Sequence, residues 1–382
     1  MRVDLHDFPR EEYRLRWEKA KKLMETKKLD ALIITDSSNY RLLTGMRSMT
    51  KNRPVALVLP RKGKPVLVAN TFLQSAAENQ TWVEDIRTYD LPFGANIVAL
   101  CLRELGLSDA AIGAELDIGC SPSFISAKLQ NELPNARFVD ASDVFSEMRL
   151  LKTDAEVESL RKACEITGKA YEELFRTLKE GITEREIAEL IFTLFMTHGA
   201  DVPIDGFLLI NSGGKYVGVP TEKPLRKGNL LWFDSGCSYR GYHSDFSRSC
   251  VVGHPSQEQA KMWAIVSRIV DECIEVIRPG IKLNEIHQAG IKACEELELD
   301  PNTVSGALAK RRPHIGHSVG LDAVEPPMID STNSTIVRSN MVLAIEPAIV
   351  RTNAVYHLEQ IVVVTNSACE ILSTVPSDLR KI

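Results

Sequence analysis

Five side chains in the second half of the chain are of the types that hold a pair of divalent metal ions. They are two aspartates, one histidine and two glutamates: Asp234, Asp245, His317, Glu346 and Glu359. The four carboxylates nearly neutralise two divalent cations, and coordination positions remain for water. A water held between two such ions loses a proton near neutral pH and becomes a nucleophile. These residues therefore predict hydrolytic metal chemistry.

The two aspartates stand 11 residues apart in the segment WFDSGCSYRGYHSDFSRS (232–249). A hairpin of two paired strands can point both carboxylates at one place, where like charges repel unless a cation lies between them. Two exposed turn aspartates are the alternative, and for a random pair this is the commoner case. Apolar residues surround this pair and favour a buried site: Trp232, Phe233, Tyr242 and Phe246.

The other three candidates interrupt apolar segments. His317 lies in GHSVGL, between glycines that allow a close approach of the backbone, although a lone histidine is as often structural. Glu346 follows the apolar segment MVLAI, and Glu359 opens the strand QIVVV. Acidic groups in such strands are costly unless they are paired or bind a metal, so the set is more specific than its members.

Length and composition predict two domains, 1–150 and 151–382, because 382 residues exceed the usual size of a single core. A net charge of −5 argues against nucleic acid or an anionic membrane as the main partner. The charged N-terminus lacks the apolar core of a signal peptide, and no apolar run approaches the roughly 20 residues that span a bilayer. Eight cysteines without a CxxC pair are expected to be reduced thiols, so the cytoplasm is the predicted compartment.

The first domain is predicted to be of the α/β class. Helical spacing over 11–28 precedes an apolar strand at 31–35, and Asp36 is a candidate helix cap. A hairpin is expected over 55–69, with Gly63 as the left-handed turn residue. Further helices are expected at 71–80, 95–105 and 122–132, and further strands at 110–116 and 136–141.

The second domain is predicted to open on a long helix that starts after Thr153 and ends at Gly181. A capping box of Thr153 and Glu156 marks its start, and Thr183 with Glu186 repeats the device for a helix through His198. Each metal candidate falls on a strand or at the edge of one, and rigid strands can hold carboxylates as accurately as a metal pair requires. Two more helices are expected, at 256–277 and 283–297.

These segments resemble the catalytic domain of the pita-bread metallopeptidase superfamily, which includes methionine aminopeptidase, aminopeptidase P, prolidase and creatinase. The resemblance runs from about residue 150 to about residue 370, and the residues before it resemble the creatinase/prolidase N-terminal domain, including LLTG (42–45). It implies an α+β pita-bread domain with a pseudo-symmetric sheet. It also implies that the five residues above bind two metal ions, and that the chain forms a homodimer.

The chain departs from the family pattern at four positions. Two histidines of the family peptidases are replaced, one at approximately Val217, before PTEKPL (220–225), and one at Val324, before Glu325. In the peptidases these imidazoles contact the substrate and stabilise the oxyanion, and the loss of one such donor costs on the order of 10²–10³ in rate. The family's arginine two residues before the last glutamate is His357, and its following aspartate is Gln360.

Several groups are candidates for moving the proton that such a reaction requires. Glu325 or Glu346 is expected to handle it, and His314 or His357 could serve as a proton shuttle. A strand histidine whose ring is bound by a carbonyl group is the alternative for His357. The catalytic set expected from the sequence is therefore Glu325, His357 and His314.

The favoured function is a dinuclear metal-dependent hydrolase, similar to an Xaa-Pro dipeptidase or aminopeptidase, that acts on a small peptide or amide. Oxygen-rich ligation with one imidazole suits two ions of Mn, Co, Zn or Fe. A non-peptidase member, such as a small-osmolyte hydrolase or lyase, is the alternative, because two peptidase histidines are valines. A catalytically inactive scaffold is a third hypothesis, although five retained ligands in a buried site are costly without a metal.

Overall fold

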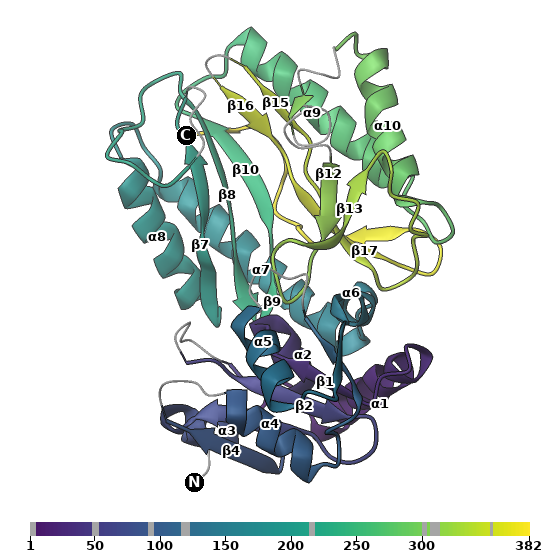
Figure 1. Cartoon of the computed structure of the whole chain (residues 1–382). Coiled ribbons are helices and arrows are strands. Elements are labelled where there is room, and N and C mark those ends of the chain that lie inside the picture. Colours follow the sequence, from purple (N-terminus) through teal and green to yellow (C-terminus); the bar gives the residue numbers. More distant parts are fainter. Residues whose placement is uncertain are drawn as a thin grey trace. The chain divides into compact units, whose positions relative to one another are not determined.

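The computed structural model describes residues 5–47, 53–90, 95–115, 123–213, 218–299, 304–305, 314–351 and 354–382. The chain divides into two compact units, Met1–Arg149 and Leu150–Ile382, one residue before the boundary expected from the sequence. The described strands of the first unit form one sheet and those of the second unit form three, and each unit has its own helices (Figure 1).

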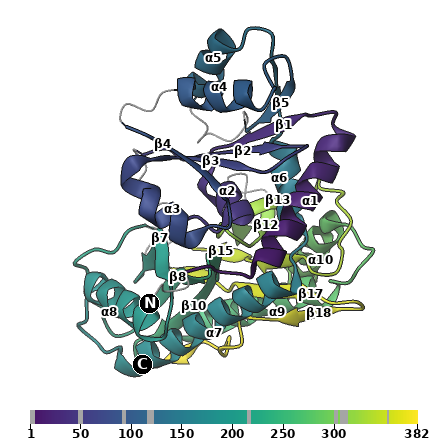
Figure 2. The same cartoon turned by 90° about the horizontal axis from the view of Figure 1, so that it is seen from below.

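The first unit is built on a mixed six-stranded sheet of order β4-β3-β2-β1-β5-β6. β1, β2 and β3 are buried at every residue, because helices cover both faces of the sheet (Figure 2). The strands are β1 (Ala31–Ile34), β2 (Ala56–Pro60), β3 (Val66–Asn70), β4 (Asp85–Tyr89), β5 (Ala111–Ala114) and β6 (Arg137–Asp140).

The helices of this unit follow most of the sequence expectations. Asp36 caps α2 by accepting hydrogen bonds from the N–H groups of Ser38 and Asn39, and Gly63 has φ 115°, as its turn requires. The sequence analysis missed α6 and the edge strand β4, whose residues are mostly half-buried and show no apolar pattern. The helices are α1 (Arg10–Thr26), α2 (Ser37–Thr44), the 3₁₀ turn η1 (Thr71–Leu73), α3 (Gln74–Gln80), α4 (Ala95–Glu104), α5 (Ser123–Glu132) and α6 (Ser142–Leu150).

Two capped helices, α7 (Asp154–Thr177) and α8 (Glu184–Thr197), open the second unit, and both predicted capping boxes are present. The predicted end of α7 at Gly181 is wrong, because Leu178 is already extended, with ψ 140°, and its side chain is buried. The N–H of Gly181 instead donates to the carbonyl of Leu225. Tertiary packing of Leu178 therefore ends the helix before the glycine.

The described strands of the second unit form three sheets. The first has the order β19-β10-β8-β7, with β9 paired to β8, and the second has the order β13-β12-β14-β17-β18. The third is β11-β15-β16. Their bounds are β7 (Val202–Asn211), β8 (Leu230–Tyr239), β9 (Tyr242–His243), β10 (Phe246–Val251), β11 (Val304–Ser305), β12 (His314–Ser318), β13 (Glu325–Asp330), β14 (Val342–Ile345), β15 (Ala348–Val350), β16 (Val355–His357), β17 (Gln360–Val364), β18 (Cys369–Ile371) and β19 (Arg380–Lys381).

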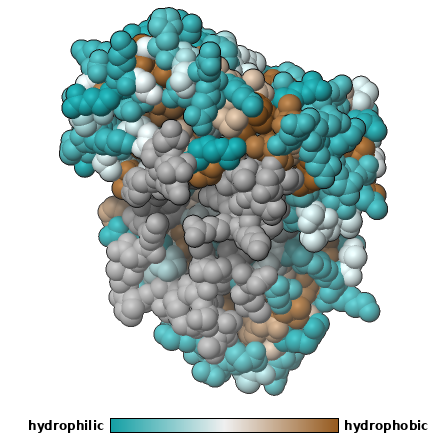
Figure 3. All heavy atoms as spheres, turned by 90° about the horizontal axis from the view of Figure 1, so that it is seen from above, coloured by the Kyte–Doolittle hydropathy of each residue, from teal (hydrophilic) through white to brown (hydrophobic). Residues whose placement is uncertain are grey.

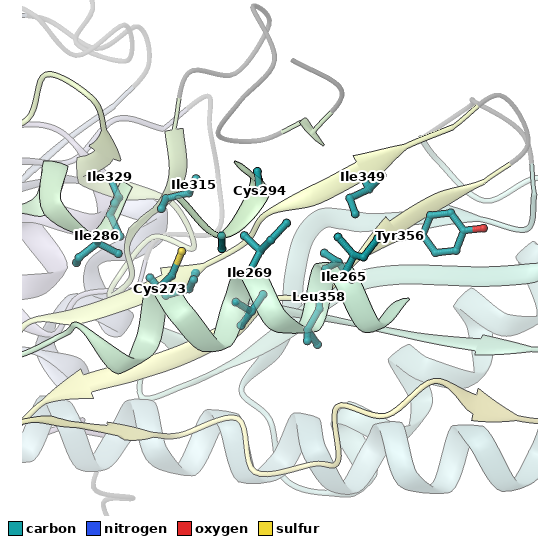
Figure 4. Close-up of a cluster of buried hydrophobic side chains, with 14 of the residues drawn as sticks. Ile265, Ile269, Cys273, Ile286, Cys294, Ile315, Ile329, Ile349, Tyr356 and Leu358 are labelled. Carbon is teal, nitrogen blue, oxygen red and sulfur yellow. The ribbon is translucent and has the colours of Figure 1, made fainter. Parts of the chain in front are cut away.

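A large hydrophobic core fixes these strands against α9 (Gln257–Glu275) and α10 (Leu283–Glu296). In Figure 4, Ile265, Ile269 and Cys273 of α9 lie beside side chains of α10 and of the strands. Ile315 of β12 belongs to this core and is fully buried. Burial of one such side chain stabilises the fold by about 1.5–3 kcal/mol, so β12 has a firm support.

On the face drawn in Figure 3, the coloured residues are mostly hydrophilic and the apolar ones occur in separate groups. Exposed apolar side chains distributed in this way are normal in globular proteins. Within the described part of the chain, no helix is both long and apolar enough to cross a bilayer.

Candidate metal centre

The five predicted metal ligands lie at strands of two sheets, and each is at most 5 % exposed. Asp234 lies in β8, and Asp245 directly precedes β10, which pairs with β8. His317 lies in β12. Glu346 directly follows β14, and Glu359 directly precedes β17, the strand paired with β14. The two sheets thus bring together residues that are up to 125 positions apart.

Two groups of side chains offer three ligand atoms each, and within a group these atoms lie within 4.8 Å of one another. Among the described residues, Glu359 belongs to both groups, as a carboxylate that bridges two ions would. Glu346 adjoins the group that contains His317, because its Oε1 lies 3.6 Å from Nε2 of His317. The groups are Asp245, His317 and Glu359, and Asp234, His357 and Glu359.

The charges in this cluster require compensation. Burial, and then the neighbouring Asp245 and Asp234, raise the pKa of Glu359 well above its ordinary value. Burial by itself would raise the pKa of Glu346. The nearby histidines, first of all the hydrogen bond of His314, have the larger combined effect and lower this pKa to about 2. Several carboxylates buried this close together are stable as anions only beside cations. Oxygen donors with one imidazole suit divalent Mn, Co, Zn or Fe, so the residues present fit a metal centre.

His314 lies beside Glu346, as its place in β12 allows. Its Nδ1 is 3.4 Å from Oε1 of Glu346, and its ring meets that of His317 edge to face at a centroid distance of 6.4 Å. The side chain of His314 is 18 % exposed, whereas that of Glu346 is 6 % exposed. His314 therefore connects the buried carboxylate with the solvent.

His357 is held at both ring nitrogens. The indole Nε1–H of Trp232 donates to Nδ1 of His357 at 2.9 Å, and Nε2 lies 3.2 Å from the backbone oxygen of Glu346. The same ring is close to two carboxylates, 3.9 Å from Oδ2 of Asp234 and 3.8 Å from Oε2 of Glu346. The structure thus places His357 within the cluster and binds its ring to the backbone.

Glu325 is buried in contact with a lysine. Its Oε2 lies 3.3 Å from Nζ of Lys152, and its Oε1 accepts from the N–H of Asp322 at 3.1 Å. Lys152 also donates to Oγ of Ser318, the residue of β12 that pairs with Glu325 across the strands. Successive side chains of a strand point to opposite faces, so Ser318 and Glu325 share the face opposite to that of His317.

Val324 precedes Glu325 and is 44 % exposed. It therefore leaves an apolar, solvent-accessible side chain where the resembled peptidases carry an imidazole. The other replaced position, approximately Val217, lies outside the described residues.

Arg248 is a buried support of the ligand strand. Its guanidinium donates to the backbone oxygens of Glu359, Ser373 and Val375 and to Oε1 of Gln360, at 2.8 to 3.0 Å. Burial lowers the pKa of Arg248 to about 10. Gln360, which stands where the family has an aspartate, supplies a neutral acceptor to this cation.

The sequence analysis did not identify three of these supporting residues, Lys152, Trp232 and Arg248, as parts of the site. A weak signal existed for Arg248, because a charged residue inside the predicted strand SDFSRSCVV needs partners if it is buried. The sequence contains no such signal for Lys152 and Trp232, because their partners lie more than 100 positions away in the chain.

Comparison with known proteins assigns the chain to a family. Residues 158–366 match the model of metallopeptidase family M24, and residues 16–151 match the creatinase/prolidase N-terminal domain. The chain belongs to metallopeptidase family M24. The predicted fold, a creatinase-type N-terminal domain followed by a pita-bread catalytic domain, is thereby confirmed, and so is the prediction of a metal-dependent hydrolase.

The chain is similar to several Xaa-Pro dipeptidases and prolidases. It is 27 % identical over 335 residues to the Xaa-Pro dipeptidase of Pyrococcus horikoshii, covering 86 % of this chain and 89 % of that one. It is 31 % identical over 212 residues to the Xaa-Pro dipeptidase of Pyrococcus furiosus, covering 55 % and 58 %. The crystal structure of the prolidase from Thermococcus sibiricus superposes with a TM-score of 0.86 at 24 % identity, covering 97 % and 99 %.

Proposed function

We propose that this chain is a dinuclear metallopeptidase that cleaves Xaa-Pro dipeptides. The observation that supports two ions is Glu359, which belongs to both groups of ligand atoms. Asp234 would complete one site, and Asp245 and His317, with Glu346 beside them, would complete the other. The names of the two Pyrococcus relatives support the substrate class.

When bound, the two ions would activate a water molecule and polarise the scissile carbonyl group. The residues of the chain then have to move one proton from the water to the leaving amine. In this proposal His314 accepts that proton at Nδ1, which lies 3.4 Å from Oε1 of Glu346, and returns it to the leaving amine. Glu325 is given no such role, because its carboxylate is held by Lys152 on the other face of β12.

The test is a metal analysis combined with an assay. Protein purified without chelator should contain about two divalent ions per chain, and with Mn²⁺ or Co²⁺ it should hydrolyse at least one of a panel of Xaa-Pro dipeptides. Asp245→Asn is the matched control, because it removes one ligand charge and keeps the shape of the side chain. The peptidase proposal is overturned if metal-loaded protein leaves every dipeptide intact.

A second candidate is a non-peptidase hydrolase or lyase acting on a small osmolyte. Val324 favours it, because an exposed valine cannot donate a hydrogen bond to an oxyanion. Val324→His should raise dipeptide hydrolysis by about 10²-fold if the missing imidazole limits a peptidase. No gain would favour the second candidate, and Val324→Asn is the control for polarity without an imidazole.

The metal identity, the assembly and the compartment stay proposals. Mn²⁺ and Co²⁺ are the first ions to test, because the donors are mainly carboxylate oxygens. Light scattering of the full chain tests the proposed homodimer, which a monomeric mass would overturn. The seven described cysteines are free thiols, which agrees with the proposed cytoplasmic location.

A further inference from the structure

We propose that Trp232 and His357 form a positioning pair, in which Trp232 fixes the tautomer of His357 and His357 fixes the metal ligand Glu346. His357 is then a support of the metal centre and not a sixth ligand. This inference rests on the metal centre proposed above, and it concerns two residues that none of the five ligand positions includes.

The direction of the first hydrogen bond decides the tautomer. An indole N–H can only donate, so Nδ1 of His357 must carry a lone pair to accept from Trp232 at 2.9 Å. The proton of the neutral ring is therefore on Nε2. That N–H points at the backbone oxygen of Glu346, 3.2 Å away, and donates to it.

The position of the pair in the fold explains why the hydrogen bond from His357 to the backbone of Glu346 supports the metal centre. Glu346 directly follows β14, where its carbonyl group no longer belongs to that strand, and Pro347 beside it has no N–H to offer. The side chain of His357 reaches this carbonyl from β16, which pairs with β15, the strand that begins two residues after Glu346. Trp232 stands two residues before Asp234 on β8, so both side chains lie on the same face of that strand. One imidazole thus connects the backbone of one ligand with the strand of another.

The same contacts argue against His357 as a ligand, although it lies within 4.8 Å of Asp234 and Glu359. A ligand histidine binds the metal through the lone pair of one ring nitrogen. In His357 the lone pair of Nδ1 accepts the indole proton, and Nε2 carries the ring proton. His317 differs, because its Nδ1 lies 3.1 Å from the backbone oxygen of Ser318 and its Nε2 faces Glu346 and Asp245.

The first experiment reads the tautomer directly. Two-bond ¹H–¹⁵N spectra of the metal-free full chain, labelled at histidine, should show one ring with a protonated Nε2 and an unprotonated Nδ1. That signal should disappear in His357→Gln and move in Trp232→Phe. A ring of His357 that is protonated on Nδ1, or on both nitrogens, overturns the proposal regardless of whether the protein cleaves dipeptides.

The second experiment measures metal affinity by competition with a chromophoric chelator. Trp232→Phe removes the indole N–H and keeps an aromatic ring, although a smaller one, and should weaken binding by about 10–100-fold, the usual effect of losing a group that orients a ligand. Trp263→Phe is the control, because it removes another indole donor, to the carbonyl of Ser377, from the same core. Equal affinities of the wild type and Trp232→Phe would contradict the proposal.

Two substitutions of His357 separate a support from a ligand. The amide of Gln can place an N–H near the position of Nε2 and restore the bond to Glu346, whereas Asn can replace only the acceptor at Nδ1. His357→Gln should therefore bind metal more tightly than His357→Asn, with the Co²⁺ absorption spectrum of the wild type. A spectrum that changes equally in both variants would make His357 a ligand. If wild-type protein binds no metal at all, the proposed function fails, while the tautomer experiment still decides the pair.

Discussion

Two buried glutamates, one in each unit, have a raised pKa but differ in the groups that surround them. Burial is the largest cause for both Glu115 and Glu359. Glu115 accepts hydrogen bonds from the N–H groups of Thr35 and Asp36 and from Nδ2 of Asn39, at 2.7 to 2.9 Å. Glu359 has carboxylates as its electrostatic neighbours instead, foremost Asp245 and Asp234.

The difference separates a structural carboxylate from a binding one. The donors around Glu115 lower its pKa and so offset part of the effect of burial, and they connect β5 to the start of α2. The carboxylate neighbours of Glu359 add to the effect of burial, so a bound cation would compensate its charge. Burial alone does not identify a site, whereas the sign of the neighbouring groups does.

The largest expected effect is that of Glu359→Gln. It removes the carboxylate common to both ligand groups, so metal affinity should fall by more than the roughly 100-fold that loss of a supporting group costs. Without metal, the variant should be at least as stable as the wild type, because a buried carboxylate among acids is gone. Isothermal titration with Mn²⁺ and urea unfolding measure the two effects. Unchanged affinity would remove the distinction between the two glutamates.

Glu115→Ala should have the opposite profile. The donors of Thr35, Asp36 and Asn39 would be left buried without this acceptor, at about 1–3 kcal/mol for the first of them. Urea unfolding should therefore show a loss of this order or more, while the affinity for Mn²⁺ stays unchanged. A drop in metal affinity as large as that of Glu359→Gln would contradict a purely structural role. Glu115→Gln is the matched control for the lost charge.

The pH dependence of stability should separate the two residues further. A carboxyl group whose pKa is raised on folding is protonated in the folded chain above 4.5, so its contribution to stability decreases as the pH rises through its raised pKa. Both glutamates thus make the metal-free protein less stable as the pH rises above 4.5. Bound Mn²⁺ should abolish the decrease in stability that Glu359 causes, and it should leave the decrease caused by Glu115 unchanged. Glu346 does not interfere, because its pKa of about 2 places its loss of stabilisation below pH 4.5. Unfolding curves at several pH values, with and without Mn²⁺, give the measurement, and a slope that metal leaves unchanged would speak against this account.

Asn39→Ala should produce the smallest effect. It deletes one hydrogen bond to Glu115 and leaves the two backbone donors in place, so the loss in unfolding free energy should be about 1 kcal/mol. Metal affinity should not change. A loss as large as that of Glu115→Ala would show that the side-chain donor, and not the backbone, stabilises the buried carboxylate.

The sequence predicted those parts of the site that leave a local trace. Glu346 and Glu359 stand out as acids in apolar segments, and the capping boxes at Thr153 and Thr183 were predicted correctly because four neighbouring residues determine them. The β2–β3 hairpin followed from two apolar runs, 55–60 and 65–69, joined by a turn that contains Gly63.

The remaining features depend on contacts between distant segments. Nothing near Trp232 in the chain indicates that its indole meets a histidine 125 positions later, and nothing near Glu325 indicates a lysine 173 positions before it. The end of α7 depends on where Leu178 is buried, which overrides the local preference for ending at a glycine. Burial and cross-strand partners, which require the fold itself, decide these cases.

The guanidinium of Arg248 has a consequence for the motions of the metal centre. It binds the carbonyl groups of Glu359, Ser373 and Val375 together, so none of these backbone segments can open without losing a charge-assisted hydrogen bond. We therefore expect the amide hydrogens of 359–362 and 373–375 to exchange with deuterium at one common rate, as a single cooperative opening unit. In that case a disturbance near the C-terminal end of the described chain loosens Glu359 as well.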